Sequence, residues 1–126
     1  MIDRRTLMAA SAILAMDGPA AAKRGTPMYG MIGRIKAQPS RRAELAAVLL
    51  EGTGTMPGCL NYVVAEDMAD PDTLIVTEAW DSKQSHDESL KLPAVQAALA
   101  KGRPLVAGFD KIAETIPLGG VGLLKA

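Results

Sequence analysis

Two strand-like segments stand almost back to back in the middle of the chain. Residues 59–66 and 73–80 are rich in β-branched and apolar side chains, which favour strands. Only residues 67–72 separate them, and this link carries three aspartates and a proline, which are turn formers. A polar link this short joins its neighbours as an antiparallel hairpin. The hairpin constrains the fold most, because it sets the direction of any strand that pairs beside it.

Ahead of the hairpin, the sequence predicts a strand and a helix. Residues 28–37 are largely apolar without a helical stripe, so we expect a strand there. Ser40 is placed to cap the helix that follows over residues 41–51. The glycines just beyond this helix end it.

After the hairpin, the sequence predicts a second helix and a last strand. Asp81 or Ser82 is placed to cap the helix, and Pro93 kinks or restarts it. Residues 104–116 are expected to form the strand. The order is then β-α-β-β-α-β, the ferredoxin-like α+β arrangement, in which two helices cover one face of an antiparallel four-stranded sheet.

Both faces of the expected sheet carry apolar residues. The two-residue period of the first strand puts Tyr29, Met31 and Ile35 on one side and Ile32 on the other. Two helices cover only one face. We therefore expect a second copy of the chain to cover the other, giving a homodimer packed sheet to sheet.

The N-terminus is typical of an export signal. Paired arginines, Arg4 and Arg5, precede a mildly apolar run and a small-residue cleavage site at residues 20–22. This order resembles a bacterial twin-arginine signal, which implies a periplasmic or secreted protein. We expect a signal over 1–22, a linker over 23–27, a domain over 28–116 and a tail over 117–126. The alternative is an Ala-rich N-terminal helix of a cytosolic protein.

Composition excludes several classes of partner and cofactor. The formal net charge is zero and aromatics make up only 3% of the chain, which argues against nucleic acid or an anionic membrane as partner. A lone cysteine, Cys59, and a lone histidine, His86, are too few for a disulfide or for a Cys- or His-rich metal site. We therefore expect no metal.

A candidate site lies where the third strand meets the second helix. The only tryptophan, Trp80, stands six positions before His86. The strand period puts Glu78 on the same side as Trp80. An imidazole exchanges protons near neutral pH, so His86 is a candidate base, with Trp80 as the wall of a pocket and Ser82 or Ser89 as hydrogen-bonding neighbours.

The same residues also have purely structural interpretations. A single histidine near a helix start is often solvated, and Trp80 by itself is typical of a core residue. Glu78 can pair with a basic side chain on the neighbouring strand. Asn61 and Tyr62 can be hairpin residues without a ligand.

Two sequence stretches resemble a known family. Pro57-Gly58-Cys59-Leu60-Asn61-Tyr62 and Thr77-Glu78-Ala79-Trp80-Asp81-Ser82-Lys83, the latter followed by His86, are similar to the antibiotic biosynthesis monooxygenase domain, including its quinol monooxygenases. The resemblance extends over residues 28–109. It implies a homodimeric α+β barrel that oxidises phenolic or hydroquinone substrates. Dioxygen would be the co-substrate, with no cofactor.

The resemblance also implies roles for particular residues. Trp80 matches the family tryptophan, and His86 stands where some members place a tyrosine or another polar group that faces the substrate. We expect His86, Trp80 and Glu78 to be catalytic. The residues that we expect to bind a small aromatic substrate are Asn61, Tyr62, Val76, Ser89, Leu90 and Phe109.

The chain departs from the family pattern at two places. Some members carry an asparagine four residues before the tryptophan, where this chain has Val76. Haem-degrading relatives use a strand-one asparagine and a histidine ten positions after the tryptophan, where this chain has Leu90, so haem degradation is disfavoured. Two alternatives remain: a non-catalytic dimeric barrel that binds a small hydrophobic ligand, and an oxygen-independent isomerase or decarboxylase on the same fold.

Overall fold

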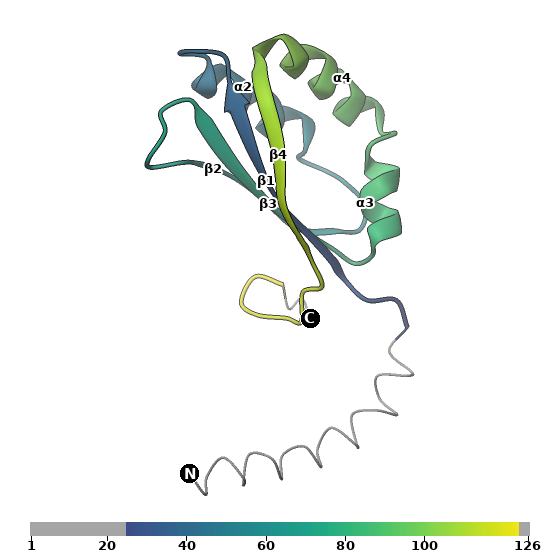
Figure 1. Ribbon diagram of the computed structural model, residues 1–126. Coiled ribbons are helices and arrows are strands. Elements are labelled where there is room, and N and C mark those ends of the chain that lie inside the picture. Colours follow the sequence, from purple (N-terminus) through teal and green to yellow (C-terminus); the bar gives the residue numbers. More distant parts are fainter. Residues whose placement is uncertain (1–24, 124–126) are drawn as a thin grey trace, which may run out of the picture.

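The computed structural model of the protein describes residues 25–123. The expected export signal and the first two linker residues lie outside this range. The elements follow in the order β1 (Tyr29–Ala37), α2 (Arg42–Gly52), β2 (Cys59–Glu66), β3 (Thr73–Trp80), α3 (Lys83–Ser89), α4 (Pro93–Gly102), the short 3-10 helix η1 (Arg103–Leu105) and β4 (Val106–Thr115) (Figure 1).

The four strands form one antiparallel sheet in the order β2-β3-β1-β4. The two central strands are β1 and β3, and Figure 1 shows α3 and α4 lying along one side of the sheet. This is the predicted ferredoxin-like α+β fold, which is confirmed. The homodimer that we expect from the two-faced sheet stays a prediction, because the structure describes a single chain.

Two buried clusters hold the helices against the sheet. The aliphatic cluster consists of Ala37, Leu45, Leu74 and Leu105. The aromatic cluster consists of Tyr29, Met56, Trp80 and Val95. The first cluster ties α2 to β1 and β3, and the second ties α4 to the opposite ends of the same two strands. Together they position the space between sheet and helices in which the candidate site lies.

The cap and break that we predicted for the second helical region are both present. The Ser82 Oγ accepts a 3.1 Å hydrogen bond from the Ser85 backbone N–H, as an N-cap does. Leu92 is extended, and Pro93 begins a separate helix, α4. Pro93 therefore starts a new helix and does not kink a single continuous one.

Two sequence-based boundaries are wrong. Ser40 does not cap α2: its φ is 67°, its N–H donates to the Asp72 carboxylate at 3.0 Å, and Arg41 takes the cap position instead. The last strand begins at Val106, not at Pro104, which lies in η1. A proline has a fixed φ and no N–H, so it suits the first turn of a helix better than a sheet.

Among residues 25–123, the tail is the only segment that lies against the sheet face away from the helices (Figure 1). Pro117 comes close to Gly30, and Gly122 comes close to the Asn61 amide. Leu118 and Val121 project into solvent. Within residues 25–123, the helices are all too short or too polar to cross a bilayer.

Candidate active site

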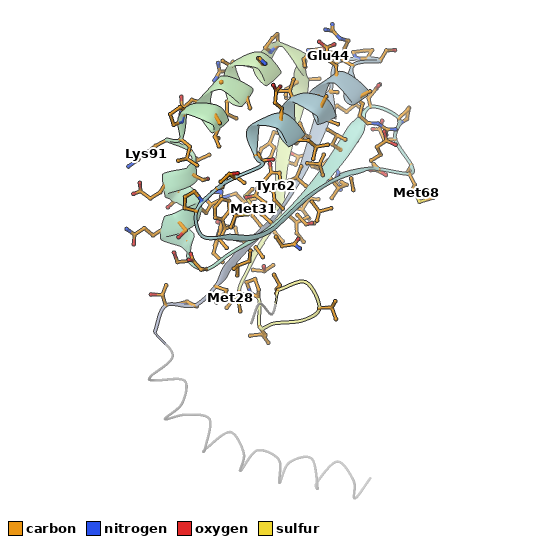
Figure 2. All side chains as sticks on the ribbon, turned by 180° about the vertical axis from the view of Figure 1, so that it is seen from behind. Met28, Met31, Glu44, Tyr62, Met68 and Lys91 are labelled. Carbon is orange, nitrogen blue, oxygen red and sulfur yellow. The ribbon has the colours of Figure 1, made fainter. Side chains whose placement is uncertain are left out.

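A cavity of about 380 Å³ lies between the sheet and the helices. Met31 and Gly33 of β1 and Val76 of β3 form part of its floor, and side chains of α2, α3 and α4 line the opposite side. Figure 2 shows Met31 and Tyr62 together on the inner side of the sheet, where they flank Glu78 in the strand register. Most of the lining is apolar, so the few polar groups in it carry its chemistry.

The His86 imidazole is enclosed at the α3 end of this cavity. Its ring centroid lies 5.1 Å from that of Tyr29 and 5.5 Å from that of Trp80, the latter edge-on at 86°. Only 13% of the side chain is exposed. The alternative of a solvated helix-start histidine therefore does not describe this residue.

Two carboxylates define the polarity of the His86 ring. The His86 Nδ1 lies 2.9 Å from the Asp87 Oδ1, and Nε2 lies 3.8 Å from the Glu78 Oε1. The hydrogen bond from His86 lowers the pKa of Asp87, and Lys83 lowers it further. An ionised carboxylate only accepts hydrogen bonds, so Asp87 keeps a proton on Nδ1. The lone pair of the neutral ring is then on Nε2, beside Glu78.

Glu78 is the buried carboxyl group of the site. Its side chain is 8% exposed, and its Oε1 accepts a 2.9 Å hydrogen bond from the Trp80 Nε1–H. Burial raises the pKa of Glu78, while the hydrogen bond from Trp80 and the nearby His86 oppose this rise to a smaller extent. Its neighbours across the strands are Met31 and Tyr62, so the alternative in which Glu78 pairs with a basic residue on the next strand is wrong.

Two tyrosines near the site have raised pKa values. The Tyr29 hydroxyl donates to the Glu114 Oε2 at 2.6 Å, and burial together with this bond raises the Tyr29 pKa. Burial also raises the pKa of Tyr62, which lines the cavity. Both phenols therefore remain protonated at neutral pH, so neither serves as the base of the site.

Most of the residues that we predicted from the sequence come together around this cavity. Those that line it are Tyr62, Val76, Glu78, Trp80, His86, Ser89, Leu90 and Phe109. The Ser89 hydroxyl is engaged within α3, where it donates to the His86 carbonyl oxygen at 2.6 Å. The Ser82 hydroxyl is the helix cap. The two serines therefore anchor the helix that carries His86, rather than presenting free hydroxyls to a ligand.

Asn61 is the predicted residue that the structure does not bring to the cavity. Tyr62 points inward, so the alternation of side chains along β2 turns Asn61 to the other face. Its Nδ2 there lies 3.6 Å from the place that a β-carbon on Gly122 would occupy. The side chain that we expected to bind the substrate thus lies beside the tail of its own chain.

Three residues of the site were missed from the sequence. Asp87 follows His86 directly in the sequence, and this adjacency could have identified it. Tyr29 reaches His86 only because the register of β1 and β3 pairs it with Trp80. Arg103 lines the cavity from η1, and no local pattern signalled it. Within the described range, no three His, Cys, Asp or Glu side chains are grouped as metal ligands would be.

Similar proteins have the same fold. A protein from Chloroflexus aurantiacus J-10-fl, provisionally assigned to the antibiotic biosynthesis monooxygenases, is 55% identical; the alignment covers 76% of this chain and 98% of that one, with a TM-score of 0.74. A mutant of SnoaB, a cofactor-independent oxygenase from Streptomyces nogalater, is 11% identical over 76% of this chain and 98% of its own, with a TM-score of 0.63, and so shares the fold alone.

Sequence comparison leads to the same group. An uncharacterised protein from Synechocystis is 28% identical over 91 residues, which are 66% of this chain and 62% of that protein, so the chain spans less than two thirds of this relative. The family model for antibiotic biosynthesis monooxygenases matches residues 28–101, more than half of the sequence. The chain belongs to the antibiotic biosynthesis monooxygenase family.

Proposed function

We propose that this protein oxidises small phenolic or hydroquinone substrates with dioxygen, without a metal or organic cofactor, and that the substrate anion is the electron donor. The observation that carries this proposal is the His86 ring at one end of an apolar cavity. Asp87 holds its Nδ1, and Nε2 is directed toward Glu78. Such a ring is a positioned base beside a space suited to an aromatic molecule.

His86 would begin the reaction. Its Nε2 takes the phenolic proton, and the imidazolium that forms is stabilised by Asp87 and by the carboxyl group of Glu78. The mostly apolar lining lowers the polarity around the phenolate, so the charges inside the site interact more strongly than they would in bulk solvent. The T-shaped contact with Trp80 keeps the imidazole in one orientation.

The oxidation itself balances without another reductant. The hydroquinone anion passes one electron to dioxygen, and the ring radical and superoxide combine to form a carbon–oxygen bond. The peroxide takes the proton held by His86. Its oxygen–oxygen bond then breaks as the hydrogen on the same ring carbon leaves as a proton, which joins the departing hydroxide to form water. One hydroquinone and one dioxygen thereby become one hydroxyquinone and one water. All four electrons taken up by oxygen come from the substrate.

Family membership and shape support this proposal. The chain belongs to a family of monooxygenases, and it shares its fold with SnoaB, which is described as a cofactor-independent oxygenase. Phenol oxidation needs a base, an apolar pocket and access for oxygen. The described cavity offers the first two directly.

Oxygen uptake tests the proposal. Metal-stripped protein is mixed with a panel of hydroquinones, beside His86→Ala and the matched surface variant Gln84→Ala on the same helix. We expect uptake above autoxidation, one labelled oxygen atom in the product from ¹⁸O₂, and a loss of about 100- to 10,000-fold in His86→Ala alone. An unchanged rate in His86→Ala would remove the assigned base. No uptake by wild type across the panel would overturn the function.

One observation favours a second candidate, a barrel that binds a small hydrophobic ligand without turnover. Val76 lies in the cavity floor, 3% exposed, where some relatives carry an asparagine. Its partners on the two neighbouring strands are Gly33 and Val64, and none of these three side chains can stabilise charge on an intermediate. Saturable binding of a hydroquinone without oxygen uptake would support this candidate. A product formed under nitrogen would instead indicate oxygen-independent chemistry.

A further inference from the structure

The two ends of the cavity differ in charge. Glu78 and His86 stand at the α3 end, and among residues 25–123 Arg103 is the only other charged side chain in the lining. Arg103 begins η1, which leads into Val106, the partner of Ala37 at the opposite end of β1. Arg103 therefore stands at the end of the cavity remote from the base, where its side chain is exposed.

The strand register gives the length of the cavity between Glu78 and Phe109. Met31 pairs with Glu78, and Ile35, four residues further along β1, pairs with Phe109. Four residues of strand span about 13 Å. Gly33 lies between them, and a β-carbon there would meet the Phe109 ring at 3.0 Å. The absence of a side chain at Gly33 keeps the two ends of the cavity joined.

Arg103 has no carboxylate partner among residues 25–123. The other arginines of this range each have one: Arg34 pairs with Asp110, Arg41 with Glu44, and Arg42 with Glu66. A guanidinium presents a planar fork of donors that matches a carboxylate or sulfonate in a bidentate contact. Beside an apolar cavity, such a group complements an anion carried by the ligand.

The size of the cavity also favours more than a single ring. An apolar cavity of about 150 Å³ suffices for benzene. The cavity measures about 380 Å³, so an unsubstituted hydroquinone would leave much of it empty. A longer molecule fills the space and reaches the Arg103 end.

We propose that Arg103 forms an anion subsite, so that the preferred substrates are elongated phenols or hydroquinones with a carboxylate or sulfonate on the order of 10 Å from the reacting ring. This inference rests on the proposed function for the identity of the ring. The competing explanation is that Arg103, at the C-terminal cap of α4, interacts only with the helix dipole. That role requires no preference among ligands.

Calorimetric titration separates the two explanations without relying on turnover. The probes are 4′-hydroxybiphenyl-4-carboxylate and its neutral carboxamide, neither of which needs to react. For wild type we expect the acid to bind about 10-fold or more tightly than the amide. Arg103→Met should abolish that preference while leaving amide binding unchanged. Arg103→Lys should retain part of it, because charge remains but the bidentate fork is lost.

Lys101→Met is the matched control, because it removes one positive charge nearby on α4, outside the lining of the cavity. It should keep the preference for the acid. Equal affinity for the two probes in wild type, no binding of either, or a preference that survives in Arg103→Met would each overturn the subsite. An equal loss in Lys101→Met would do the same, because it would assign the effect to net charge. If Arg103→Met does not fold, Arg103→Gln replaces it.

Failure of the subsite and failure of the proposed function remain distinguishable. If Arg103-dependent acid binding occurs and hydroquinone acids give no oxygen uptake, the subsite stands and the oxidation is wrong. If neutral hydroquinones are turned over without any preference for acids, the oxidation stands and the subsite is wrong.

Discussion

The aliphatic and aromatic clusters pack against the same face of the sheet, but only the aromatic cluster holds polar groups of the site. In the aliphatic cluster, Leu45 and Leu74 are almost completely buried among hydrocarbon neighbours. In the aromatic cluster, Trp80 is just as buried, yet its Nε1–H is bound to Glu78 and its ring meets His86 edge-on. Apolar burial stabilises the fold by about 1.5–3 kcal/mol for each large side chain, whereas burial of a carboxyl group opposes folding. One end of the core stabilises the chain, and the other gives up stability to hold polar groups in place.

The largest effect on stability should come from the aliphatic cluster. We expect Leu74→Ala to lower the free energy of unfolding by about 2–5 kcal/mol, because it removes a buried side chain and leaves a cavity. Urea denaturation measures this change. Leu50→Ala, at a leucine that is 57% exposed, should change it by less than about 0.5 kcal/mol. Similar losses in both variants would contradict the stabilising role assigned to the aliphatic cluster.

A smaller loss should follow when the polar bond of the aromatic cluster is removed. Trp80→Phe keeps an aromatic ring but leaves the buried Glu78 oxygen without its donor, so we expect a cost of about 1–3 kcal/mol. The same substitution in a Glu78→Leu background isolates the bond, because no acceptor remains there. Equal costs in the two backgrounds would show that the hydrogen bond contributes nothing.

The aromatic end also depends on a short helix. Ser82 caps the seven-residue α3, which carries His86. Ser82→Ala should cost about 1 kcal/mol, because the Ser85 N–H loses its acceptor. Hydrogen exchange of the α3 amides would report this loss locally, with Gln84→Ala as the variant that leaves the cap intact. Unaltered exchange in Ser82→Ala would mean that tertiary contacts alone hold α3.

The smallest effect that we expect depends on pH and involves Glu78. Burial raises the pKa of Glu78 above its unfolded value, so the folded state holds the proton more tightly. The stability contributed by that proton is fully present below the unfolded pKa and is lost as pH rises through the folded pKa. As pH rises from acid to neutral, the free energy of unfolding of the wild type should therefore fall relative to that of Glu78→Gln. The exposed-site variant Glu88→Gln should run parallel to wild type; a parallel curve for Glu78→Gln would contradict the cause assigned here.

Short-range patterns were enough for the elements and for part of the site. The bounds predicted for β2 and β3 are those of the structure, because turn formers and β-branched runs act within a few residues. The strand period correctly put Glu78 and Trp80 on one side, and a capped helix start brought His86 back toward them. The prediction for Ser40 failed because a distant residue, Asp72, binds its N–H instead.

The sequence by itself determined the order of the elements, the hairpin and the closeness of Trp80 and His86, since each depends on residues near one another in the chain. Tertiary structure alone decided the rest. The register of β1 against β3 put Tyr29 against His86, the packing of η1 brought Arg103 to the far end of the cavity, and the pleat of β2 turned Asn61 outward. Register and packing are settled by which arrangement of the whole sheet buries the most apolar surface, and that competition is among residues far apart in the sequence.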